Sequence, residues 1–272
     1  MLTLIILTIL FGHWLRLCRA RRLWRFGKHN VKKTKTRCDV SGNRITICAD
    51  DFGMTADINC ATADLARAGK IDAVSCMVNL PFFTADELAA LGAVQLGLHF
   101  TLAETPQEFR NLVLRAYTRQ LKRQEIYNEL AAQFDHFEEV AGRRPDFIDG
   151  HLHIQQLPVI RDVVIEFIQN RCADNPPRVR NAAMPLSQCS LKSFFIAAPG
   201  RVLKRKLLNA GIPTNDGFGG IYNYADFMRY PQHLEKFLRT VPGGGIIMVH
   251  PGLDEPWRRA EYDALISNDW KK

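Results

Sequence analysis

The feature that most restricts the fold is an alternation, from Asn43 onward, of short apolar runs with segments of helical periodicity. Strand-type runs are expected at residues 44–53, 73–81, 94–102, 142–154, 178–182 and 245–252. Helical segments are expected between them, at residues 55–69, 84–92, 108–139, 158–171 and 190–210. Strands separated by helices indicate βαβ units and a parallel sheet. Because no repeat or linker interrupts residues 41–272, we predict one barrel-like α/β domain there.

Composition agrees with a folded domain, and it places the basic charge in a tail. The 272 residues are 47% hydrophobic and 24% charged, which is ordinary for a globular protein. The formal net charge is +8, but the stretch Arg16–Cys38 holds ten Arg or Lys and no acid. The remainder is therefore close to neutral. A nucleic-acid-binding surface is not expected, since the basic charge does not belong to the domain.

The N-terminal segment, residues 1–40, is expected to lie outside the domain and beside a membrane. Residues 2–12 form an apolar run about half as long as the ~20 residues that span a bilayer. Basic residues follow this run, the reverse of their order in a signal peptide. We predict that residues 1–37 bind an anionic membrane surface as an interfacial anchor. A short span with snorkelling flanks and a start codon assigned too far upstream are the alternatives.

Cysteine usage favours a reducing compartment. The chain has an odd number of cysteines, seven, and no pair has CxxC spacing. We therefore expect neither disulfides nor a structural zinc site.

Polar residues follow the predicted strands where each strand ends. They are Asp50 and Asp51, His99, the group Asp149, His151 and His153, and His250. In α/β barrels the carboxyl ends of the strands surround the active site. Four separate strands that deliver Asp or His to one rim are hard to explain by packing, so we expect a site there.

Each motif also has a plainer explanation when it is taken alone. Asp50 and Asp51 would repel each other unless a cation or proton lay between them; alternatively, one caps the helix that begins near Thr55 and the other is solvated. His99 could be a structural histidine after an apolar strand. His250 could serve in acid–base chemistry or in a turn shaped by the Pro and Gly that follow it.

The motif DGHLHI is more specific. If it continues a strand, His151 and His153 point to the same face and reach one site. Asp149 could then fix the tautomer of a histidine ring. Together, one carboxylate and two imidazoles from these motifs would make a metal site with open positions for water and substrate.

The motifs ADDFG, GLHF, DGHLHIQQLP and VHPG, in this order, resemble the YdjC-like carbohydrate deacetylases, a family that includes the chitooligosaccharide deacetylases. The resemblance covers roughly residues 43–267. It implies a distorted (β/α) barrel related to polysaccharide deacetylases, with one divalent metal ion, Mg²⁺ or Zn²⁺. Carried over by motif, Asp50 would be the general base and His250 the general acid. The metal ligands would be Asp51, His99 and His151.

Two further residues are carried over with less definite roles. His153 matches a family histidine near the pocket, whose role stays open. Arg180, in the run RVRNA, resembles a family arginine that faces the substrate.

The sequence departs from the chitooligosaccharide members in two ways. Those members typically have D-S-H-x-H-x-H, whereas this chain has Gln155 at the last histidine position, and its span between GLHF and DGHLH is shorter. It looks more like a branch that deacetylates an N-acetylhexosamine on undecaprenyl phosphate for lipid A modification. Such an enzyme would be cytoplasmic and peripheral on the inner membrane, and it could form a homodimer. The basic stretch Arg201–Lys206 could meet phosphate or membrane, but a solvated helix face is the better explanation of it.

Other functions remain open from the sequence. A soluble chito- or oligosaccharide deacetylase is the nearest alternative. A glycosidase needs two carboxylates ~5–9.5 Å apart across the bond, which adjacent residues do not readily provide. A metal phosphoesterase also uses Asp and His clusters. The non-enzymatic alternative is an inactive membrane-associated barrel adaptor, which would not need the complete set of polar residues.

Overall fold

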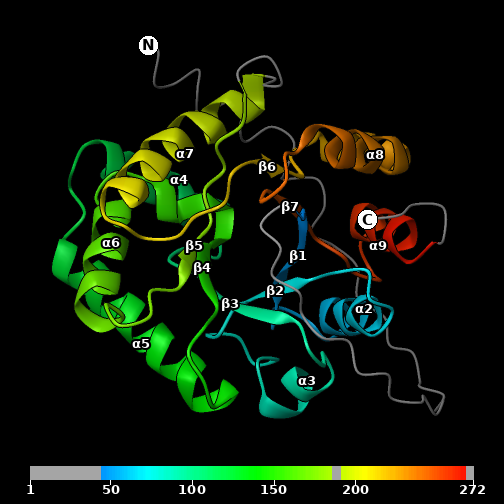
Figure 1. The fold of residues 1–272 in the computed structure, drawn as a ribbon, viewed down its shortest axis with the longest axis horizontal. Helices are drawn as coiled ribbons and strands as arrows, with labels where there is room; N and C mark the ends of the chain where they lie inside the picture. The colour runs from blue at the N-terminus through cyan, green and yellow to red at the C-terminus, as the bar shows by residue number, and fades with distance from the viewer. Residues whose placement is uncertain (1–43, 186–190, 268–272) are drawn as a thin grey trace.

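The computed structural model describes residues 44–185 and 191–267, so the predicted N-terminal anchor lies outside the described residues. A single sheet of seven parallel strands forms the centre of the molecule (Figure 1). Its strands are β1 Thr46–Phe52, β2 Ala73–Cys76, β3 Gln95–Phe100, β4 Phe147–Gly150, β5 Arg178–Val179, β6 Phe218–Gly219 and β7 Ile246–Val249. Their order across the sheet is β5-β4-β3-β2-β1-β7-β6.

The sheet curls into a distorted barrel, as predicted. Its two edge strands, β5 and β6, are only two residues long. The segment before β6 reaches across to β5, where Val179 and Thr214 form a parallel bridge. The amide of Val179 donates to the carbonyl of Pro213 at 2.9 Å. This short connection joins the two edges where regular strand pairing ends.

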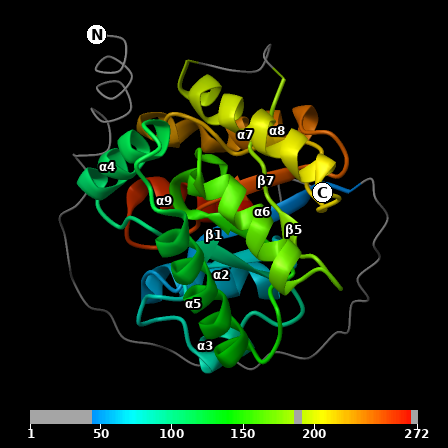
Figure 2. The ribbon, with the colours of Figure 1, turned by 90° about the vertical axis from the view of Figure 1, so that its left-hand side faces the viewer.

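Helices cover the outside of the curled sheet (Figure 2). They are α2 Ala56–Arg67, α3 Ala85–Ala89, α4 Pro106–Tyr117, α5 Arg123–Ala141, α6 Ile160–Arg171, α7 Leu191–Asn209, α8 Tyr230–Thr240 and α9 Pro256–Ile266. Two 3₁₀ helices, η1 His151–Gln156 and η3 Tyr224–Arg229, follow β4 and β6. Within the described ranges, no helix is both long and apolar enough to cross a membrane.

The predicted helical region 108–139 consists of two helices. A capping box formed by Thr105 and Glu108 starts α4. The chain then turns at Arg119, whose φ of 57° is left-handed, and the amide of Gln120 bonds back to the carbonyl of Arg115. The helical spacing of apolar residues continues across this turn, so the sequence pattern did not reveal that α4 and α5 are separate helices.

The prediction that His151 and His153 lie on one face of a strand is wrong. Strand β4 ends at Gly150, and Leu152 and His153 have left-handed φ values of 55° and 61° within η1. The turn is tight at Gly150, where a Cβ atom would lie 2.8 Å from Cγ1 of Ile154. The chain therefore folds back over the end of its own strand, and the two histidines diverge.

Candidate active site

The inner face of the barrel carries an apolar layer with a polar layer above it. Four buried residues of the apolar layer pack in one cluster: Cys48, Ala73, Phe147 and Met248. Two residues further along the same strands come Asp50, Ser75, Asp149 and His250. Because side chains alternate along a strand, these polar groups share the inner face with the apolar ones. His99 joins them from β3, two residues after Gly97, whose missing side chain leaves room for the Phe147 ring.

A bulge in β1 brings both carboxylates of the ADDFG motif to this layer. Between Ala49 and Phe52 the strand has one more residue than its partner β2. Asp51 has a left-handed φ of 66°, and Gly53 follows with a φ of 96°. A side chain at Gly53 would come within 2.7 Å of the carbonyl oxygen of Met77. Asp50 and Asp51 are both buried, so neither is solvated, and neither side chain caps α2, which begins after Thr55.

Asp51, His99 and His151 form a cluster that could hold a metal ion. Oδ1 of Asp51 lies 3.5 Å from Nε2 of His99 and 3.1 Å from Nδ1 of His151. The three candidate ligand atoms all lie within 4.8 Å of one another. One carboxylate oxygen and two imidazole nitrogens suit a divalent ion and leave positions free for water or substrate. The resemblance implied these three residues, and the structure brings them together.

The orientation of the His99 ring fits the same use. Its Nδ1 lies 2.6 Å from Oδ1 of Asp149 and 2.9 Å from Oγ of Ser75. A carboxylate on Nδ1 directs the lone pair of Nε2 toward the cluster, as in many metal sites. Burial disfavours the charged ring, but Asp149 and Asp51 outweigh it and raise the pKa of His99 to about 10 in the metal-free protein. The raised pKa means that the metal-free ring carries a second proton and a positive charge. A divalent cation bound by the cluster would supply that positive charge instead.

Asp50 is held by Arg180 in a two-pronged ion pair. Nη1 and Nη2 of the buried arginine lie 2.7 and 2.6 Å from the two oxygens of Asp50. Its Nε lies 3.1 Å from Oδ2 of Asp149. Arg180 was expected to face the substrate, whereas its side chain is 1% exposed and contacts these two carboxylates. Cys48, Asp50 and Asp149 could also be taken for a metal site, but the guanidinium already supplies their countercharge.

His250 stands at the end of β7 as a neutral imidazole. Burial lowers its pKa to about 4, although Asp51 and Asp50 act in the opposite direction. Its Nδ1 is buried without a hydrogen-bond partner. The ring lies edge-on to Tyr224 and Trp257, with centroids 6.1 and 5.8 Å away. The ring therefore has one nitrogen without a hydrogen-bond partner, close enough to Asp51 and Asp50 to feel their charges.

His153 lies apart from the three clustered residues. Its ring is edge-on to Phe218 at 5.5 Å, and its buried Nδ1 has no partner. Burial, together with the nearby charge of Arg180, lowers its pKa to about 3. The position gives His153 no direct contact with Asp51, and its role stays open.

Helix α9 supplies two residues that the sequence did not reveal. Nη2 of Arg258 lies 2.6 Å from Oδ2 of Asp51, the oxygen that faces away from the two histidines. Glu261 accepts from the amide of His250 at 2.7 Å and from the hydroxyl of Tyr222 at 2.9 Å. Both are buried although they occur in the polar run PWRRAEYDALI. Arg258 and Glu261 are three residues apart, which is also the spacing of ordinary ion pairs on the surface of a helix. The sequence alone therefore did not indicate that they belong to the site.

Comparison with known proteins shows the family of the domain. The model of a family described as YdjC-like protein matches residues 44–272. The chain belongs to the YdjC-like family. The match spans the whole described barrel and all four motifs, and it leaves out the N-terminal 43 residues.

Several relatives share this YdjC-like domain. A chitooligosaccharide deacetylase from Proteus mirabilis is 29% identical over 240 residues, which cover 80% of this chain and 85% of the relative. A carbohydrate deacetylase from Danio rerio is 31% identical over 146 residues, or 47% of each chain. A chitooligosaccharide deacetylase from Salmonella paratyphi B is 30% identical over 144 residues, 47% of this chain and 56% of that one. The last two alignments span about half of each relative.

A solved structure shares the YdjC-like fold. It comes from Enterococcus faecalis, and its description names cellobiose-phosphate cleavage. The TM-score is 0.59 at 19% identity, with 84% of this chain and 92% of that chain covered. At this identity the likeness concerns the fold alone, and it supports the barrel architecture.

Proposed function

We propose that this protein is a metal-dependent N-deacetylase that hydrolyses the acetamide of an N-acetylhexosamine. The observation that carries the proposal is the cluster of Asp51, His99 and His151 beside two groups suited to proton transfer, Asp50 and His250. The deacetylase names of the Proteus and Danio relatives support the same chemistry. Adjacent Asp50 and Asp51 with their histidines suit this reaction better than a glycosidase, which needs two carboxylates on opposite sides of a bond.

The ligands proposed for the divalent ion, Zn²⁺ or Mg²⁺, are Asp51, His99 and His151. When bound there, such an ion polarises the acetamide carbonyl and lowers the pKa of water from about 15.7 toward ~7. Asp149 and Ser75 hold His99 in the tautomer that the site requires. Arg258 holds the second oxygen of Asp51, so the first stays directed at the histidines.

Asp50 is the proposed general base, and Arg180 positions it. The two hydrogen bonds from the guanidinium fix both carboxylate oxygens at the rim. A carboxylate so fixed takes the proton of the attacking water without first reorienting, which is the benefit of a preorganised group. Arg180 therefore acts through Asp50.

His250 is the proposed general acid. It starts the reaction neutral, because burial lowers its pKa. As the tetrahedral oxyanion forms, the new negative charge raises the pKa of the neighbouring imidazole. The proton that Asp50 took from the attacking water passes to His250, which delivers it to the departing amine, so the water gives its hydroxyl to acetate and its proton to the amine.

The more specific proposal is a substrate carried on undecaprenyl phosphate and destined for lipid A modification. Exposed large apolar side chains are compatible with an amphipathic substrate: Phe82, Leu114, Tyr117, Leu152, Phe194, Leu208 and Met228. Of these, Leu152 belongs to η1, the segment that also carries the proposed ligand His151. Membrane attachment through residues 1–37, a cytoplasmic location at the inner membrane and a homodimer belong to this proposal.

Gln155 replaces the last histidine of the chitooligosaccharide pattern, and it contacts the arginine that holds Asp50. It is fully buried, and its amide donates to the backbone carbonyl of Arg180 at 3.0 Å. The residue that distinguishes this chain from the chitooligosaccharide pattern thus supports the arginine behind Asp50. The nearest alternative, a soluble oligosaccharide deacetylase, is favoured by the names of the Proteus and Salmonella relatives.

Acetate release separates the two substrates. The full-length protein, held in detergent, is given an N-acetylhexosamine phospholipid or N-acetylchitobiose, each with and without EDTA. The proposal predicts EDTA-sensitive release from the phospholipid alone. Release from the chitobiose alone would keep the deacetylase and refute the lipid-linked substrate. No release from either would refute the deacetylase.

A further inference from the structure

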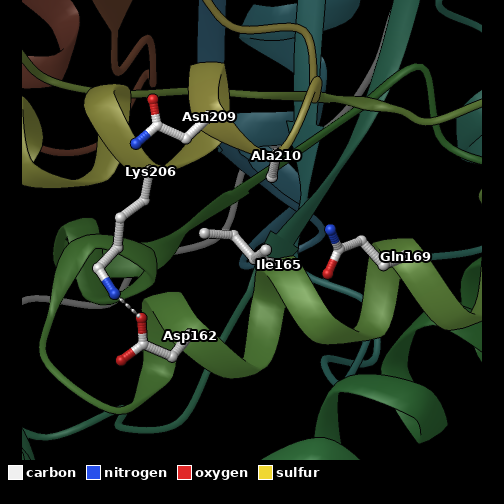
Figure 3. A pocket seen from close by; sticks show the side chains of 6 residues that line it. All are labelled: Asp162, Ile165, Gln169, Lys206, Asn209 and Ala210. Carbon is white, nitrogen blue, oxygen red and sulfur yellow. Dashed lines mark hydrogen bonds and ion pairs between the residues drawn. The ribbon is translucent and has the colours of Figure 1, made fainter.

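A cavity of about 320 Å³ lies between α6 and α7, two of the helices that cover the outside of the sheet (Figure 3). Its lining is Asp162, Ile165, Gln169, Lys206, Asn209 and Ala210. The two charged side chains pair with each other, with Nζ of Lys206 2.7 Å from Oδ1 of Asp162. Among the described residues, no buried polar atom that lacks a hydrogen-bond partner belongs to this lining. The cavity therefore has no buried group that a ligand would satisfy.

His250 does have such an atom, and this sets it apart from His99. Nδ1 of His99 lies 2.6 Å from a carboxylate oxygen of Asp149, which orients the ring. Nδ1 of His250 is buried and has no hydrogen-bond partner among the described residues. The backbone amide of His250 donates to Glu261 at 2.7 Å, but that contact does not select a side-chain rotamer. The orientation of the His250 ring must therefore come from packing.

Two aromatic rings supply that packing. The Tyr224 ring, in η3, is almost perpendicular to the His250 ring, at 89° with the centroids 6.1 Å apart. The Trp257 ring, at the start of α9, meets His250 at 62° with the centroids 5.8 Å apart. Tyr224 and Trp257 also contact each other, at a centroid distance of 4.4 Å. Each of the three rings thus contacts both of the others, and edge-on contacts of this kind are favourable arrangements of aromatic rings.

The two aromatic rings are connected to residues that already belong to the site. The guanidinium carbon of Arg258 lies 4.5 Å from the centroid of the Trp257 ring. Tyr224 is edge-on to Tyr222 at 5.1 Å, and the hydroxyl of Tyr222 donates to Glu261 at 2.9 Å. Trp257 is only 8% exposed. Both rings therefore have contacts besides His250 that restrict their movement.

Burial is the main cause of the low pKa of His250, which is about 4. The two aspartates of the site raise this pKa, and the positive charges of Arg258 and His99 lower it. The titratable and charged groups near the ring are Asp50 and Asp51 after β1, His99 of β3, His153 of η1, Tyr224 of η3, and Arg258 and Glu261 of α9. Loss of an aromatic neighbour would admit water to the ring, and water favours the charged form. The pKa of His250 therefore reports how well its neighbours enclose it.

We propose that Tyr224 and Trp257 are positioning residues for His250: they fix the orientation of its ring and exclude water from the edge that carries Nδ1. The proposal rests on the proposed function for the role of His250 as the general acid. The two rings act through the imidazole and need no contact with the reacting atoms. An imidazole fixed in this way delivers its proton without first turning, which is the benefit of a preorganised group.

The first test does not depend on activity. NMR of the metal-free, full-length protein with ¹⁵N-labelled histidine follows the titration of His250, and His250→Gln identifies its signal. Tyr224→Ala and Trp257→Leu each remove one ring, whereas Tyr224→Phe keeps it. The matched control is Tyr127→Ala, because Tyr127 of α5 makes an edge-on contact with Phe167 of α6 at 5.5 Å.

We expect the pKa of His250 to rise by at least about one unit in Tyr224→Ala and in Trp257→Leu. It should stay unchanged in Tyr224→Phe and in the control. Tyr224→Leu, which keeps an apolar side chain without the ring, should raise it as well and carries less risk to folding. An unchanged pKa in the variants without a ring would overturn the proposal, even if the unaltered protein releases acetate.

Acetate release then tests whether the rings act through His250. Tyr224→Ala alone should lower kcat at least about tenfold with little change in KM, and Tyr224→Phe should retain the activity. In the His250→Gln background, Tyr224→Ala should lower kcat no further. An equal loss in both backgrounds would show that Tyr224 acts on the substrate directly, which would overturn the proposal. A raised pKa of His250 in the variants, without acetate release by the unaltered protein, would keep the positioning of the ring and refute the deacetylase.

Discussion

Two adjacent buried aspartates coexist in this site because each has its own arginine. Arg180 pairs with Asp50, and Arg258 pairs with Asp51. Burial opposes ionisation of Asp51, but Arg258 and the two histidines outweigh it and hold the pKa of Asp51 well below its usual range. The β1 bulge directs the carboxylates to different partners, which gives one motif two proposed roles.

The first prediction concerns Asp50. Replacing it by Asn keeps the shape of the side chain but removes the proposed base, so acetate release should fall by about 10²–10⁴-fold. Metal content should stay at the level of the unaltered protein, because Asp50 is not a proposed ligand. Both quantities are measured on the same preparation, and full activity in Asp50→Asn would show that another group accepts the proton.

The second prediction concerns Arg258. In Arg258→Gln the buried Asp51 carboxylate loses its ion-pair partner, which typically costs about 3–5 kcal/mol. For a domain of this size that lowers the Tm of the metal-free protein by roughly 6–20 °C. A bound cation would neutralise the same carboxylate, so metal should raise the Tm of the variant more than that of the unaltered protein.

The neighbouring Arg259→Gln is the control for that measurement, since Arg259 pairs with Asp263 on the exposed face of α9. An exposed pair contributes about 0–1 kcal/mol, so its Tm should change little. Equal thermal shifts in the two variants would contradict the role given to Arg258.

At the scale of elements, helix α9 contacts two separate parts of the site. Arg258 reaches Asp51 after β1, while Glu261, one turn further along, accepts the amide of His250 after β7. Burial raises the pKa of Glu261 to about 7, although the amide of His250 and the hydroxyl of Tyr222 favour its charged form. A small change in α9 would therefore affect both the proposed metal ligand and the proposed acid.

The third prediction follows from Glu261. Its pKa is raised on folding, from 4.5 to about 7. Its contribution to stability is therefore fully present below pH 4.5 and is lost as the pH rises through about 7. Glu261→Gln should remove this loss, up to about 3 kcal/mol, so the variant gains stability relative to the unaltered protein between pH 4.5 and 7.

Urea unfolding of the metal-free proteins at several pH values measures the difference. The other titrating groups are common to both chains, so their contributions cancel in the comparison. Parallel curves for the variant and the unaltered protein would contradict the account of Glu261.

The sequence predicted those elements whose patterns are local. Strand β1 and strand β7 are apolar runs that end in Asp and His, and both were placed correctly. Strand β6 was missed, because a two-residue strand held by neighbours has no periodicity of its own. The fold-back at Gly150 was missed as well, since left-handed Leu152 and His153 are stabilised by contacts with the barrel and not by their residue types.

At the scale of the whole molecule, the proposed metal site exists only when the barrel is complete. Its residues come from β1, from β3 and from η1, far apart in the chain. Asp149 and Ser75, which orient His99, come from two further strands. Metal binding must therefore be coupled to folding, as it is wherever the unfolded chain lacks the site.

The fourth prediction uses this coupling. Metal at about 100 times its Kd should stabilise the folded protein by about 2.7 kcal/mol, or roughly 5–10 °C in Tm. EDTA should abolish the shift. In His151→Ala the shift should shrink or vanish, whereas replacement of exposed His136 on α5 should leave it intact. A full shift in His151→Ala would place the metal elsewhere.

The central claim is that a metal ion held by Asp51, His99 and His151 is required for deacetylation. The most direct measurement is acetate release by the EDTA-stripped protein as Zn²⁺ or Mg²⁺ is titrated back, with an N-acetylhexosamine phospholipid and N-acetylchitobiose as substrates. We predict no activity in the stripped protein, full recovery at one equivalent of bound metal, and no recovery in His151→Ala. Undiminished activity after stripping, or full recovery in His151→Ala, would contradict the account.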